Sequence, residues 1–216
     1  GGVIRREADG KTPNGVLEEL AAMPSMVKFL TPITQEGKDH FLKRGLELAK
    51  SFGYTTANEG RMFGPMHAVM ADAAKRGLVD IDFIGWMDYT GRAELDKAFS
   101  TSYSNHYRLG GLKITLDGSP QGRTAWRTVP YLIPPDGQEP GYSGYPAISD
   151  TKQVEAYLDE AYAKGWPVKV HANSDAAIDQ LFTALRPVVA KYGVKPGQTM
   201  LIHGQLIRPD QVKELK

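Results

Sequence analysis

Beyond residue 38, apolar positions follow two alternating spacings along the chain. They recur every three or four residues, as on one face of a helix, over residues 39–52, 65–76, 150–164 and 174–192, with a shorter stretch at 91–99. Short β-rich or alternating runs lie between them, at residues 54–58, 79–87, 111–116, 167–172 and 199–203. This regular succession of strand and helix predicts an α/β fold with a parallel sheet covered by helices.

The α/β pattern fits two architectures, an open doubly wound sheet and an arc of a (β/α)8 barrel. No G-x-G-x-x-G motif follows a strand, which argues against the dinucleotide-binding form of the open sheet. Two segments fall outside the rhythm. We predict a loop-rich lead-in over residues 1–37 and, over the Gly-, Pro- and Tyr-rich residues 117–149, a long ordered loop that covers the site.

The composition argues against several classes of function. The 216 residues include 26 Lys and Arg against 25 Asp and Glu, a net charge of +1, so we expect no nucleic-acid partner. Cysteine is absent, which excludes disulfides, cysteine-bound zinc and a thiol nucleophile. No apolar run approaches the ~20 residues that cross a membrane, so we expect no membrane partner either.

Three polar side chains interrupt the predicted strands. Lys113 lies on one strand, and His171 and His203 end the next two. Buried parallel strands are normally apolar throughout, and parallel α/β folds place their sites at the carboxyl ends of the strands. A lone histidine there is more often a hydrogen-bonded structural residue, but two on neighbouring strands favour a metal site. A neutral lysine beside them can react with carbon dioxide, and the resulting carbamate can bridge two metal ions.

Other polar residues lie near the same strand ends. Asn173 and Asp175 follow His171 at a strand-to-helix turn, where they would either cap the helix or face the site. Together with residues after two other strands, they make up the set that we expect to bind substrate: Glu59, Asp117, Arg123, Asn173 and Asp175. Aromatic residues of the long loop are further lining candidates: Trp126, Tyr131, Tyr142 and Tyr145.

Four segments carry a family resemblance. They are GGVIRREADGKTPNGVLEE at the start, GLKITLDGSPQGRTA around Lys113, HANSDAAID at His171 and LIHGQLIRPDQV around His203. They resemble, in this order, the stretch before the second barrel strand, the lysine strand, and the fifth- and sixth-strand histidine motifs of the amidohydrolase superfamily. Within it, they are similar to amidohydrolase family 3, the YtcJ-like metal-dependent hydrolases. That family's sixth-strand motif often has Glu where Ile202 stands.

The resemblance implies a (β/α)8 TIM barrel, of which this chain holds about five of the eight strands. It also implies one or two divalent metal ions, usually zinc, per full-length subunit. Lys113 would be the carboxylated bridging lysine, and His171 and His203 would bind the second metal. The family's first-strand His-x-His pair and its general-base Asp have no counterpart here. We therefore expect the first strand, the last two strands and a small flanking β-domain to lie outside the chain.

We expect the parent protein to be a metal-dependent amidohydrolase. It would cleave a C–N bond of a small amide, N-formyl or cyclic amide with metal-activated water, and the chain alone would be inactive. A non-catalytic small-molecule-binding or regulatory domain on the same scaffold is the alternative, and an unrelated α/β binding protein with structural histidines is a third. A shared metal requires the tips of Lys113, His171 and His203 to lie within about 10 Å of each other. Because an arc leaves two sheet edges open, we also expect self-association into a homo-oligomer.

Overall fold

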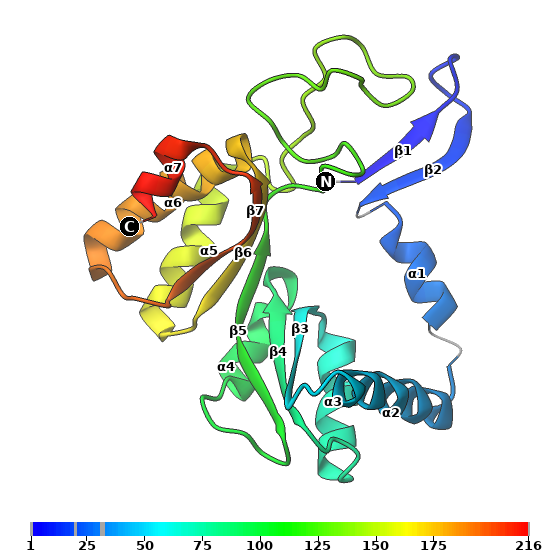
Figure 1. The fold of residues 1–216 in the computed structure, drawn as a ribbon, viewed down its shortest axis with the longest axis vertical. Helices are drawn as coiled ribbons and strands as arrows, with labels where there is room; N and C mark the ends of the chain where they lie inside the picture. Colours follow the sequence, from blue (N-terminus) through cyan, green and yellow to red (C-terminus); the bar gives the residue numbers. More distant parts are fainter. Residues whose placement is uncertain (1, 20, 31–32, 216) are drawn as a thin grey trace.

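Five parallel strands form the central sheet of this computed structural model, which describes residues 2–19, 21–30 and 33–215 (Figure 1). They are β3 (Thr56–Met62), β4 (Asp82–Asp88), β5 (Tyr107–Thr115), β6 (Val168–Ser174) and β7 (Thr199–Leu206). Their order across the sheet is their order along the chain. An open doubly wound sheet reverses its strand order at a switch point, so the observed order is that of a barrel arc.

Helices precede, separate and follow the strands of the sheet as predicted. They are α2 (Gln35–Ser51), α3 (Gly64–Lys75), α5 (Thr151–Lys164), α6 (Asp175–Tyr192) and α7 (Pro209–Glu214), while a 3-10 turn, η1 (Tyr89–Glu94), and α4 (Leu95–Ala98) replace the helix expected at 91–99. The Asp150 side chain caps α5 by accepting from the N–H of Lys152, and Gly165 ends it with a left-handed φ of 67°. Pro187 lies inside α6 without dividing it.

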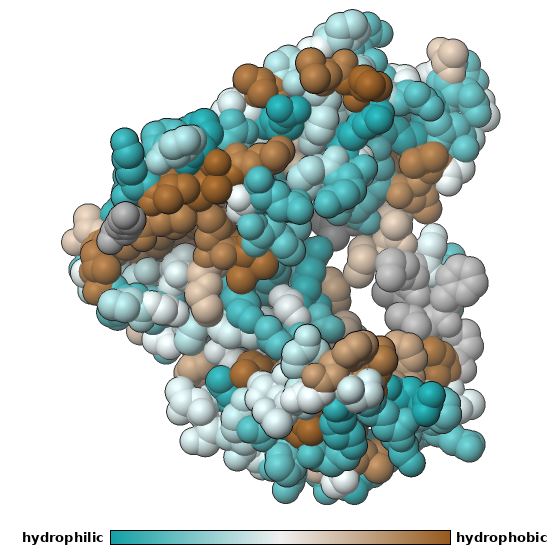
Figure 2. Space-filling model, viewed as in Figure 1, coloured by the Kyte–Doolittle hydropathy of each residue, from teal (hydrophilic) through white to brown (hydrophobic). Residues whose placement is uncertain are grey.

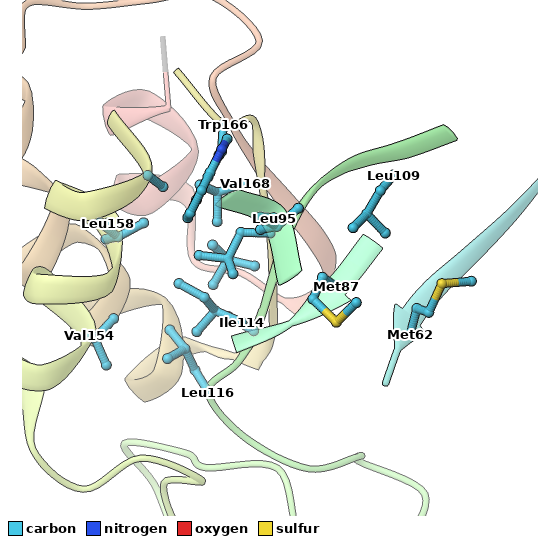
Figure 3. Close-up of a cluster of buried hydrophobic side chains, with 14 of the residues drawn as sticks. Met62, Met87, Leu95, Leu109, Ile114, Leu116, Val154, Leu158, Trp166 and Val168 are labelled. Atoms are coloured by element: carbon cyan, nitrogen blue, oxygen red, sulfur yellow. The ribbon is translucent and has the colours of Figure 1, made fainter. Parts of the chain in front are cut away.

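The core lies between the sheet and these outer helices (Figure 3). Every second residue from Leu112 onward is completely buried: Leu112 and Ile114 in β5, and Leu116 just after it. They belong to the same core cluster as the α5 side chains Val154 and Leu158. Their neighbours Lys113, Thr115 and Asp117 therefore point to the opposite, concave side of the sheet. Apolar side chains on the outer face of the sheet pack against the helices, and polar side chains lie on the inner, concave face.

The first residues differ from the predicted loop-rich lead-in. They form an antiparallel hairpin of β1 (Gly2–Arg6) and β2 (Pro13–Glu19), followed by α1 (Met23–Leu30). Asp9 closes the turn by accepting from the backbone N–H groups of Lys11 and Thr12. The hairpin lies beside the long loop (Figure 1), where Thr124 Oγ1 donates to Glu19 Oε1 over 2.7 Å. It therefore forms part of the cover over the site end of the sheet.

The face of the molecule drawn in Figure 2 is mostly hydrophilic with local apolar areas. One such area lies over β7, α6 and α7, where Leu206, Val212 and Leu215 are exposed, and another lies on the long loop at Leu132. Within the described ranges, none of the helices combines the length and apolar character needed to cross a membrane.

Candidate metal centre

The rings of His171 and His203 converge at the carboxyl ends of β6 and β7. Their centroids are 4.6 Å apart and the ring planes are at 78°. Lys113 on β5 lies on the same side of the sheet, because its Cα pairs with that of Lys169, two residues before His171. The three predicted metal ligands therefore come from three consecutive strands and share the concave face.

A backbone irregularity brings His203 to this face. In the register of β6 and β7, His171 pairs with Ile202, while His203 pairs with Ala172 on the core side. His203 has a left-handed φ of 77° and Gly204 one of 57°, and the register slips by a residue after this point. This is a β-bulge, a device that re-aims a side chain next to a site. Strand alternation alone would place Ile202, and not His203, beside His171.

The ring of His171 is held through Nε2. That atom lies 3.0 Å from the carbonyl oxygen of Gly118 and 3.3 Å from Asp117 Oδ1. Asn173 Nδ2, 3.2 Å from the same nitrogen, donates instead to the Gly118 carbonyl at 2.8 Å. The carbonyl and the carboxylate only accept hydrogen bonds, so Nε2 carries the proton and donates. The lone pair is then on Nδ1, the atom left for a metal, as expected when outer contacts fix a ligand's tautomer.

Asp117 joins three segments beneath this ring. Its buried carboxylate accepts from the backbone N–H groups of Asn173 at 2.8 Å, Ser174 at 3.0 Å and Trp126 at 3.1 Å. These donors occupy both oxygens and connect the end of β5 to the end of β6 and to the long loop. The predicted substrate residues Asp117 and Asn173 thus lie against His171, with contacts that orient it.

The electrostatics favour neutral nitrogen groups at this site. Burial, together with the charges of Arg61 and Lys169, lowers the pKa of Lys113 to about 8, although Asp88 opposes the shift. Burial and the neighbouring His171 and Lys113 lower the pKa of His203. Neutral imidazole is the form that binds a metal, and neutral amine is the form that reacts with carbon dioxide.

The other predicted substrate residues lie away from the two histidines. Asp175 Oδ1 accepts from the N–H of Thr128 at 3.0 Å and so anchors the long loop to the start of α6. Arg123 Nη1 donates to the carbonyl of Pro134 and lines a separate cavity of about 320 Å³ between the loop and the hairpin. Glu59, inside β3, accepts from the N–H of Arg61. Of the aromatic candidates, Tyr131 and Tyr142 stack on each other within the loop, with centroids 5.9 Å apart.

Two residues near Lys113 escaped the sequence analysis. Arg61 Nε donates to Asp88 Oδ2 over 2.8 Å, and the Asp88 side chain is fully buried. Asp88 immediately follows the predicted strand at 79–87, so the strand-end rule could have found it. Arg61 lay beyond the predicted end of its strand, because β3 extends to Met62.

The donor set suits part of a divalent metal centre. Two neutral imidazoles are typical zinc ligands, and a carbamate on Lys113 would add oxygen ligands. The described part of the chain contains no group of three His, Cys, Asp or Glu side chains that could hold a metal ion. Zinc normally takes at least three protein ligands, so these residues fit one side of a centre.

Comparisons with known proteins agree with the fold and show the family. The sequence model of amidohydrolase family 3, described as the amidohydrolase family, matches residues 1–216. The protein YtcJ of Bacillus subtilis (strain 168), an amidohydrolase by name, is 27% identical over 215 residues, which cover 96% of this chain and 38% of YtcJ. Crystal structures of uncharacterized metal-dependent hydrolases from Pyrococcus horikoshii and Pyrococcus furiosus both superpose with a TM-score of 0.75. At 19% and 20% identity they cover 98% of this chain and 42% and 44% of their own lengths. The chain thus spans less than half of these relatives, and it belongs to the amidohydrolase family.

Proposed function

We propose that the protein containing this chain is a metal-dependent hydrolase that cleaves the C–N bond of an amide, N-formyl or cyclic amide substrate. The observation that carries the proposal is the convergence of His171 and His203 at the carboxyl ends of neighbouring barrel strands. Family membership and the names of the structural relatives, both metal-dependent hydrolases, support hydrolysis.

Each residue of the site has a task in this proposal. His171 would bind the metal through Nδ1, because Nε2 donates to Gly118, and His203 would bind beside it. Neutral Lys113 would form a C–N bond to carbon dioxide and lose one proton to solvent, giving a carbamate as a further ligand. A divalent metal, zinc or another, supplies the Lewis acidity that activates water and polarises the substrate carbonyl. Asp117 lies against Nε2 of His171, and Asn173 holds the Gly118 carbonyl to which that nitrogen donates.

The isolated chain should be a poor catalyst. It presents two imidazoles and one amine, whereas structural and catalytic zinc sites take three or four protein ligands. We therefore propose that the remaining ligands and the general base come from other parts of the full-length protein. The isolated chain would then bind a divalent ion weakly and turn over no substrate.

Metal analysis of the full-length protein tests the function directly. We expect one or two divalent ions per subunit, hydrolysis of simple N-formyl and N-acetyl amines, loss of both with a chelator, and recovery of both with added zinc. His171→Ala and His203→Ala should lose both metal and activity. His106→Ala is the matched control, because this exposed histidine pairs with Asp82 at the start of β4, the end of the sheet opposite the site. Hydrolysis that persists without metal, or a folded protein that binds none from excess zinc, would overturn the proposal.

A further inference from the structure

A small polar cavity lies beside the candidate metal centre. Its volume is about 10 Å³, room for roughly one water-sized group. The walls include Asp117 and Gly118, and the carbonyl of Gly118 is the group that holds His171 Nε2. A polar group seated in this cavity therefore lies next to the residues that would carry the chemistry.

Three side chains on its walls carry hydrogen-bond donors that lack an acceptor. The Thr115 hydroxyl is buried without a partner, and Thr115 as a whole is 8% exposed. No residue in the described ranges accepts a hydrogen bond from Nη1 or Nη2 of Arg61, or from the Tyr89 hydroxyl. Buried donors are nearly always paired in folded proteins, so the Thr115 hydroxyl points to a ligand that supplies an acceptor. The partly exposed Arg61 and Tyr89 have donors free to bind the same ligand.

Arg61 is held in a fixed orientation. Its Nε donates to the fully buried carboxylate of Asp88, and its guanidinium lies 5.4 Å from the ring centre of Phe63. Asp88 is itself fixed, because Oδ1 accepts from the N–H of Thr90 at 3.0 Å. Nη1 and Nη2 then form the free end of the guanidinium fork, which matches the two oxygens of a carboxylate.

We propose that Arg61, with the hydroxyls of Thr115 and Tyr89, binds a carboxylate on the substrate, one oxygen of which would occupy the cavity. The preferred substrates would then be amides that carry an acidic group, such as N-acylated amino acids. This inference rests on the proposed hydrolase function, whose substrate class it names.

The charges on the cavity walls are compatible with an anion. The carboxylate of Asp117 is satisfied by three backbone donors, and that of Asp88 is paired with Arg61. Glu19 is exposed at the hairpin and accepts from Thr124, so solvent screens its charge.

A pair of matched probes tests the inference without requiring turnover. N-acetylglycine and N-acetylglycinamide differ only in that a carboxylate becomes a carboxamide. By titration calorimetry with the full-length protein, we expect N-acetylglycine to bind at least ~10-fold more tightly. Arg61→Gln should abolish this preference. Arg92→Gln is the control, because Arg92 also pairs with a carboxylate, that of Glu160, but is not among the residues that line the cavity.

A second variant separates binding from folding. Thr115→Val removes a hydroxyl that has no partner, so the melting temperature should not fall, while N-acetylglycine binding should weaken several-fold. Equal affinity for the two probes, or a preference that survives Arg61→Gln, would overturn the carboxylate site. Metal-dependent hydrolysis of neutral amides would then still support the proposed function. Conversely, a preference that depends on Arg61, in a protein that hydrolyses nothing, would keep the site and reject the function.

Discussion

The Cα of His203 pairs with Ala172 on the core side of the sheet, yet its ring meets that of His171 edge-on at 4.6 Å. The left-handed φ of 77° at His203 resolves this contradiction. Such a conformation is uncommon outside glycine, although histidine adopts it more readily than most residues. Strain of this kind persists where the surrounding structure enforces it, and it concentrates at functional sites.

The paired rings predict a shared effect on metal binding. His171→Ala and His203→Ala should each weaken divalent-metal affinity of the full-length protein by at least ~100-fold, more than loss of an outer contact typically costs. Calorimetric zinc titration of the two variants and of His106→Ala measures this. Wild-type affinity in either of the first two variants would show that the rings do not share an ion.

Removing the carboxylate of Asp117 should destabilise the fold. Asp117→Ala leaves three backbone N–H groups without this acceptor, two of them buried, so we expect a loss of about 3 kcal/mol or more in the free energy of unfolding. Asp159→Ala removes an exposed carboxylate that pairs with Lys191, and it should cost less than about 1 kcal/mol. Urea denaturation of both variants makes the comparison. Similar losses would mean that the Asp117 contacts contribute little.

The long loop depends on a close approach at Gly144. A Cβ there would lie 2.0 Å from the carbonyl oxygen of Ala125, and φ is 78°. Gly137 has a similar φ of 74° but open space around it, so Gly137→Ala reports the backbone strain alone, about 1 kcal/mol. We expect Gly144→Ala to cost clearly more and to expose the loop to limited proteolysis. Equal behaviour of the two variants would show that the loop adapts to the clash.

Acid should release the anchor between the loop and α6. Burial raises the pKa of Asp175, but hydrogen bonds from Thr128 and Ala176 and the charge of Arg208 outweigh it and lower the pKa below its usual range. The unfolded chain then binds the proton first, so stabilisation by this carboxylate is complete above about pH 4 and is lost as pH falls further. At pH 6 the free energy of unfolding of the wild type should exceed that of Asp175→Asn by about 2 kcal/mol. This difference in stability should become smaller below pH 4. Urea denaturation across that range measures the difference, and a difference that does not change with pH would contradict the assignment.

Periodicity predicted the sheet because most of its strands are buried and its helices amphipathic. Lys113, His171 and His203 were found as polar residues in positions that should be apolar. That the His203 side chain faces the inner side of the sheet could not be predicted in this way, because a bulge shifts the alternation of side chains by one residue. Arg61 was missed since the polar run Asn58-Glu59-Gly60-Arg61 hides the second half of β3.

The hairpin was missed for a different reason. Its strands are largely exposed and gain their contacts from a loop more than one hundred residues away, as the bond between Glu19 and Thr124 shows. Local spacing carries no trace of such a partner. The Asp9-Gly10 turn was the signal that could have identified it.

The order of the strands has a consequence for how the chain acquires its structure. Each strand of the sheet pairs with the one made just before it, so the sheet can grow strand by strand as the chain leaves the ribosome. The pairing of β5 with β6 has the largest loop-closure entropy, because the long loop and α5 lie between these two strands. Assembly should therefore pause after β5. The strand that carries Lys113 would then be in place before the two strands that carry His171 and His203 are added.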